Sequence, residues 1–67
     1  MTYLTETQID DMAHAAYETF MVSGERRDMP RVAAEYAADE FGVTPRKSAV
    51  LLAVKRANLM YEAARLR

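Results

Sequence analysis

The chain has no cysteine and no tryptophan, and its 67 residues include one histidine, two glycines and two prolines. Without cysteine no disulfide can stabilise the fold. His14 alone does not supply the several ligands of a structural zinc site, and two isolated glycines exclude a glycine-rich phosphate loop. A chain of this length buries only about 60% of its unfolded surface, so its stability is marginal. Because association is the remaining way to stabilise it, we expect a homodimer.

Long apolar runs are also missing from the sequence. A secretory signal needs a basic start followed by an apolar stretch, and Met1 to Asp11 has neither. Spanning a bilayer takes about 20 predominantly apolar residues, and no stretch approaches that length. We therefore expect a cytoplasmic protein that does not bind a membrane.

Charge is distributed unevenly along the chain, although the net charge is only −1. Residues 1–42 carry three basic and nine acidic side chains, and residues 43–67 carry six basic and one acidic. The first interpretation is neutralisation between helices or between subunits. The second is a basic face that binds nucleic acid or an acidic protein.

The residue types that dominate the sequence favour helix, and turn signals divide it into three segments, so we predict a single all-α domain over residues 1–67. The first helix covers about 6–23. Thr5 and Gln8 form a capping box, Leu4 and Ile9 form a hydrophobic staple, and Gly24 ends the helix. Its apolar stripe consists of Ile9, Met12, Ala13, Ala16, Tyr17 and Phe20.

The second helix is predicted over about 30–41, with Asp28 as its cap, Pro30 in its first turn and Gly42 at its end. Its buried face is Val32 or Ala33, Tyr36, Ala37 and Phe41. The third helix is predicted over about 45–66, with Thr44 as its cap and Pro45 at its first position. At ~1.5 Å per residue it reaches ~33 Å, which is long for so small a domain.

Two apolar faces run along this third helix. The face expected to pack inside the domain holds Ala49, Val50, Ala53, Val54, Ala57, Met60, Tyr61 and Ala64. The second face has leucines seven residues apart, as in a coiled coil, alternating with alanine and one arginine. We predict that it forms the dimer interface, through Leu52, Arg56, Leu59, Ala63 and Leu66. The alternative is that another helix of the same chain covers these leucines.

Catalytic constellations are absent from the sequence. His14 falls off the apolar stripe of the first helix, and Ser23 and Ser48 have no histidine partner in their sequence context. The adjacent carboxylates Asp10 and Asp11, like Asp39 and Glu40, point about 100° apart on a helix and so form no shared site. We therefore expect no enzymatic activity, no catalytic or metal site and no cofactor.

Residues 34–51 resemble a helix-turn-helix motif. The motif positions are occupied by Ala38, Gly42 and Val43. Arg46 and Lys47 would then open a recognition helix that reads DNA, which makes a DNA-binding transcriptional regulator the alternative function. The pattern breaks at Ser48, where the motif has an apolar residue, and at Pro45, where it has a polar one. The negative net charge also differs from that of most DNA-binding domains.

The segment Asp-Asp-Met-Ala-His-Ala-Ala-Tyr-Glu-Thr-Phe, residues 10–20, resembles the opening helix of many very small proteins of temperate bacteriophages. The whole chain is similar in size and style to phage-encoded inhibitors of host proteins, such as anti-CRISPR proteins and quorum-sensing anti-activators. This resemblance implies a non-catalytic protein that binds and blocks a host regulatory or DNA-binding protein. A structural phage or plasmid component that assembles into larger oligomers through the leucines is a third interpretation.

Charged side chains at the helix ends and on the second helix are the candidates for contacts with a partner, whether protein or DNA. They are Arg26, Arg27, Glu35, Asp39, Glu40, Arg46 and Lys47. An acidic surface that mimics nucleic acid would combine those acidic residues with Asp10, Asp11 and Glu18 of the first helix.

Overall fold

The computed structural model describes residues 3–66, which form three α-helices and one short 3-10 turn and include no strand. The elements are α1 (Glu6–Ser23), η1 (Arg26–Asp28), α2 (Met29–Phe41) and α3 (Lys47–Arg65). The predicted all-α architecture with a long C-terminal helix is therefore confirmed. Arg67, which belongs to the basic third of the sequence, lies outside the described residues.

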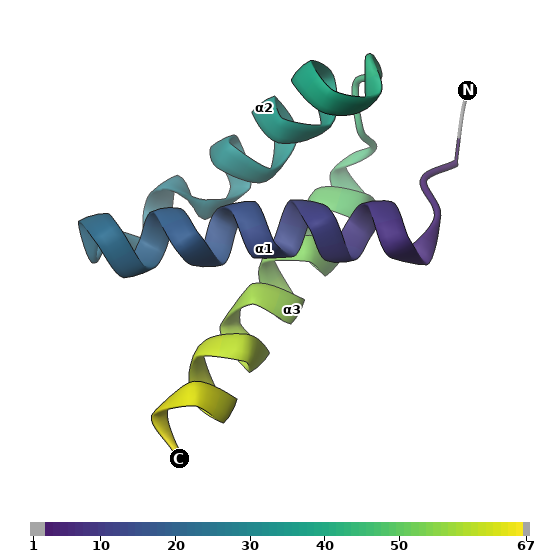
Figure 1. Cartoon of the computed structure of the whole chain (residues 1–67). Helices are drawn as coiled ribbons and strands as arrows, with labels where there is room; N and C mark the ends of the chain where they lie inside the picture. The colour runs from purple at the N-terminus through teal and green to yellow at the C-terminus, as the bar shows by residue number, and fades with distance from the viewer. Residues whose placement is uncertain (1–2, 67) are drawn as a thin grey trace.

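Helix α1 lies across the middle of the molecule, with α2 on one side and α3 crossing behind it (Figure 1). Helix α3 packs mainly against α1 and less extensively against α2. Its C-terminal half extends past α1 and away from α2 (Figure 1), which contributes to the elongated dimensions of 38 × 20 × 17 Å. Over the described residues, none of the helices combines the length and the apolar character that crossing a membrane requires.

Both ends of α1 follow the local signals in the sequence. The Gln8 amide donates to Thr5 Oγ1 at 3.1 Å, and the Thr5 amide donates to Gln8 Oε1 at 2.8 Å, so the capping box is formed. Gly24 adopts φ 74° and donates its amide hydrogen to the Phe20 carbonyl at 2.7 Å. That left-handed conformation favours glycine and closes the helix.

The starts of α2 and α3 differ from the prediction. Helix α2 begins at Met29, directly after η1, and the Asp28 side chain makes no capping hydrogen bond. Helix α3 begins at Lys47, two residues later than predicted, and its N-cap is Arg46 rather than Thr44. Pro45 disfavours helical backbone geometry in the preceding residue, Thr44, which keeps the connection between α2 and α3 extended there. Arg46 is also extended, at ψ 151°, and accepts the Val50 amide at 3.1 Å.

The core is made mostly of small side chains. Among residues 3–66, those buried are Ile9, Met12, Ala13, Ala16, Met29, Ala33, Ala37, Ala53 and Ala57. Six of these are alanines, which let the helices approach closely but remove little apolar surface from water. Met29, which the sequence analysis did not place in the core, is one of the two largest fully buried side chains.

Partly buried aromatic residues extend the core at its edges. Phe20 meets Tyr61 edge to face, with ring centroids 5.1 Å apart, and Tyr36 meets Phe41 at 5.6 Å. Beyond Tyr61 the core ends, and Ala64, predicted to lie on the intramolecular face, is exposed. That part of the prediction was wrong because α3 extends past the helix against which it packs (Figure 1).

Candidate functional site

Helix α3 turns its leucines outward and its alanines inward. Leu51 is 59% exposed, Leu59 60% and Leu66 80%, while Leu52 is 36% exposed. By contrast, Ala53 and Ala57 are completely buried at the crossing with the other helices. The same chain therefore leaves Leu59 and Leu66 uncovered, which argues against the alternative that α1 or α2 packs over them.

The exposed leucines form two separate surfaces because residues on a helix are spaced about 100° apart. The first, called the leucine seam, consists of Ala49, Leu52, Arg56, Leu59, Ala63 and Leu66. The second, called the Leu51 face, consists of Lys47, Leu51 and Lys55, which are all exposed and follow one another at four-residue steps. The sequence analysis missed the Leu51 face, since Leu51 belongs to neither predicted stripe.

Arg56 is held by its own chain. Its Nη1 donates to Asp10 Oδ1 at 2.8 Å, and its Nη2 pairs with the Glu6 carboxylate. The hydrogen bond that Arg56 donates to Glu6 is the largest of several influences that together raise the pKa of Arg56. The cation predicted in the seam is thus already neutralised by carboxylates of α1, so part of the charge asymmetry is compensated between helices.

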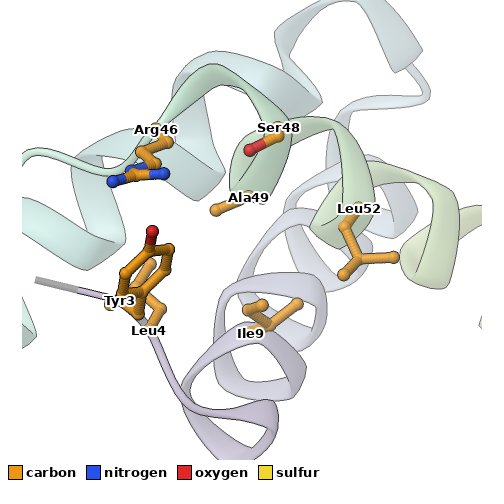
Figure 2. A pocket seen from close by; sticks show the side chains of 7 residues that line it. All are labelled: Tyr3, Leu4, Ile9, Arg46, Ser48, Ala49 and Leu52. Atoms are coloured by element: carbon orange, nitrogen blue, oxygen red, sulfur yellow. The ribbon is translucent and has the colours of Figure 1, made fainter.

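A cavity of about 200 Å³ opens at the N-terminal end of the leucine seam. Figure 2 shows Tyr3 and Leu4 facing Ala49 across the opening, with Ile9 and Leu52 farther along α1 and α3. The Arg46 guanidinium lies 4.3 Å from the centroid of the Tyr3 ring. The lining is mainly apolar, so the cavity suits an apolar side chain. It joins segments distant in sequence, and no local pattern predicts it.

The basic residues predicted to contact a partner do not form one patch. Arg26 and Arg27 precede α2, whereas Arg46 and Lys47 follow it, so the length of α2 separates the two pairs (Figure 1). Arg26 packs against aromatic rings, 5.2 Å from the centroid of Tyr61. The continuous basic face that DNA binding would need is therefore not assembled from these four side chains.

The predicted acidic residues also separate. Burial raises the pKa of Tyr36, and the charges of Asp11, Glu40 and Glu18 raise it further, which places these carboxylates near one phenol between α1 and α2. Glu35 instead accepts from Arg31 at 3.0 Å. Asp10 is paired with Arg56, as described above, and Asp39 is exposed on α2. Two of the six predicted acidic residues, Asp10 and Glu35, are thus engaged by arginines of the same chain.

Within residues 3–66, no group of three or more His, Cys, Asp or Glu side chains could hold a metal ion. His14 is exposed and borders a hollow of about 370 Å³ with Tyr17, Met60, Ala63 and Ala64. That hollow lies between α1 and the C-terminal half of α3.

The helix-turn-helix resemblance is preserved at its turn. Gly42 adopts φ 66° and donates to the Ala38 carbonyl at 3.1 Å. Ser48, however, where the motif has an apolar residue, is exposed, and Leu51, one turn later, is exposed as well. The start of α3 therefore does not pack as the second helix of the motif would. No family model, curated protein or solved structure matches this chain, so its own surfaces are what bear on its function.

Proposed function

We propose that this protein is a non-catalytic regulator or inhibitor that acts by binding another protein through α3. The observation that carries this proposal is the Leu51 face, where a leucine that is 59% exposed lies between two exposed lysines. Apolar side chains at the centre of a patch with charges around them are typical of protein interfaces. The matching surface on the partner is apolar with an acidic rim, which lysines attract and orient.

Two further aspects of the protein belong to this proposal. A phage-encoded inhibitor of a host regulatory or DNA-binding protein fits it, because such a protein acts by stoichiometric binding. A homodimer also fits it, because Lys47 and Leu51 do not belong to the leucine seam and stay exposed beside it. Both aspects agree with a small core that gains stability from association.

Site-specific photo-crosslinking in cells tests the proposal. The reactive residue p-benzoylphenylalanine replaces Leu51 and, as a control, Val22, which is 91% exposed near the end of α1. We expect a discrete adduct with another protein from position 51 and none from position 22. Combining the position-51 probe with Lys47→Glu, which lies outside the leucine seam, should weaken the adduct while the circular dichroism spectrum stays unchanged.

DNA binding is the competing outcome and is measured separately. The anisotropy of a labelled random duplex is followed at ~50 mM and ~200 mM salt, because phosphate contacts weaken steeply as salt increases. Binding that shows this dependence and is lost in an Arg46→Glu, Lys47→Glu variant, without a protein adduct at position 51, would overturn the proposal in favour of a DNA-binding regulator. We expect no binding at micromolar protein.

A further inference from the structure

We propose that two copies of this chain pair through their leucine seams with the two α3 helices antiparallel. The twofold axis passes midway between Arg56 and Leu59. This inference concerns the leucine seam, and Lys55, at the edge between the seam and the Leu51 face, is the one residue that both proposals use. Its occupant is a second copy of the chain, in one orientation and one register. Four observations support that assignment.

The first observation is the alternation of large and small residues along the seam. In a twofold pair, if one residue contacts a second across the axis, the second contacts the first. The antiparallel register places Leu52 against the partner's Ala63 and Leu66 against the partner's Ala49. Leu59 then lies against the partner's Arg56. Each leucine therefore packs into the space left by a smaller neighbour or beside an arginine stem, as close packing requires.

The second observation is Arg56, which disfavours the parallel orientation. In a parallel pair each seam residue faces its own copy, so the two Arg56 side chains would share one layer. A polar residue at such a position lowers the stability of a parallel coiled coil. The antiparallel register separates the two cations, and each is already neutralised by Glu6 and Asp10 of its own chain.

The third observation is charge complementarity beside the seam. Lys55 and Glu62 are seven residues apart on α3, and both lie along the same edge of the seam. In the antiparallel register Lys55 faces the partner's Glu62, and symmetry creates the same pair a second time. Within the single chain, Glu62 forms an ion pair with Arg65 of the same helix, with 2.9 Å between Glu62 Oε2 and Arg65 Nη2. Exposed ion pairs contribute little stability, but they select orientation.

The fourth observation is the cavity at the end of the seam. Ala49 and Leu52 form its α3 wall, and Ile9 and Leu4 contribute apolar surface from the other side (Figure 2). The register that sets Leu66 against the partner's Ala49 brings Leu66 to the mouth of this cavity. The volume of about 200 Å³ accommodates a leucine side chain. Leu66, the C-cap of α3, is 80% exposed, more than any leucine within that helix, and the pairing would cover it.

Disulfide trapping tests the orientation and the register together. The natural chain has no cysteine, so each variant carries a single thiol. Leu52→Cys and Ala63→Cys proteins are mixed in a glutathione redox buffer, and the disulfides are identified by mass. We expect the mixed 52–63 disulfide to dominate. Disulfides joining only identical positions would show a parallel pair and overturn the proposal.

Charge exchange provides an independent test. Lys55→Glu and Glu62→Lys each place like charges across the antiparallel pair, so each protein alone should dimerise more weakly. Mixed together, they restore both ion pairs, and we expect the ratio of heterodimer to the two homodimers in native mass spectrometry to exceed its statistical value by roughly fivefold. A statistical mixture would overturn the register, because only this register brings position 55 opposite position 62.

A matched pair of leucine substitutions tests whether the seam pairs at all. Leu59→Glu should give a monomer or an unfolded chain, whereas Leu51→Glu, at an equally exposed leucine of the same helix, should leave the dimer intact. Sedimentation velocity measures the size and circular dichroism the fold. An unchanged Leu59→Glu dimer, or a natural protein that is monomeric at ~1 mM, where even weak association is visible, overturns the proposal. Neither result bears on the adduct expected at position 51.

Discussion

Arg56 in α3 donates a hydrogen bond to Asp10 in α1 over 2.8 Å, although 46 positions separate the two residues in the sequence. Glu6, one turn earlier in α1, binds the same guanidinium. The first turns of α1 are thereby joined to the middle of α3. An arginine that by its spacing belongs to the leucine seam is also engaged within its own chain.

Arg56→Ala should lower the Tm, and the loss should become smaller as salt increases. The carboxylates of Glu6 and Asp10 are largely exposed, so their attraction for the guanidinium is screened by ions. Arg56→Lys should retain only part of the effect, because an ammonium group lacks the guanidinium fork that reaches two carboxylates. Thermal melts at low and high salt measure this. Arg65→Ala, which breaks only a pair within one helix, is the control. Equal losses for the two alanine variants would contradict the prediction.

Thr5→Ala should destabilise the protein by about 1 kcal/mol, since it removes a side-chain acceptor at the N-terminus of α1. The matched control is Thr7→Ala, which changes an exposed threonine inside the first turn without removing a cap. Urea denaturation followed by circular dichroism measures both free energies of unfolding. If the two variants lose the same stability, the capping box does not stabilise α1.

Ala53→Leu should destabilise the protein by about 1–3 kcal/mol, because Ala53 is fully buried and a larger side chain must separate the helices. Ala38→Leu is the control, because Ala38 is exposed on α2 and its substitution should change stability by less than about 0.5 kcal/mol. Chemical denaturation compares the two. A tolerated leucine at position 53 would mean that the helices are not closely packed there.

Tyr36 should make the protein less stable at alkaline pH. Burial, reinforced by the charges of Asp11, Glu40 and Glu18, raises the pKa of Tyr36 in the folded chain. The phenol therefore ionises first in the unfolded chain, and stability falls as pH rises above the unfolded value of about 10. Tyr36→Phe removes this component, so its free energy of unfolding should decrease less between ~pH 10 and 11.

The control for Tyr36 lies in the same titration. Below ~pH 9 the Tyr36 phenol is neutral in both the folded and the unfolded natural protein, so the difference in stability between that protein and Tyr36→Phe should stay constant there. Parallel curves above pH 10 would show that ionisation of Tyr36 is not linked to folding.

Features that depend on near neighbours in sequence could be predicted, and features that depend on how helices cross could not. The Thr5–Gln8 capping box and the ends at Gly24 and Gly42 involve residues at most four apart, and all three are confirmed. The apolar stripe of α1 is confirmed for the same reason, because helical periodicity alone determines which residues share a face.

In the candidate site, the sequence predicts which residues share a face of α3 but not which residues of other helices they contact. Heptad spacing identifies Leu52, Leu59 and Leu66 as one line, and the structure leaves them uncovered to different degrees. Heptad spacing cannot identify the ion-pair partners of Arg56, since these depend on where α1 crosses α3. The cavity beneath Tyr3 and Arg46 likewise requires three segments to meet.

Helix α3 fits against α1 with alanines and presents leucines on its outer side. The residues that determine its fold are therefore different from those that its surroundings can contact. A substitution at Leu51 or Leu59 leaves the buried alanines untouched, whereas one at Ala53 or Ala57 changes the core directly. A change at Leu51 can consequently alter what the outer side of this helix binds while the alanine scaffold beneath it remains the same.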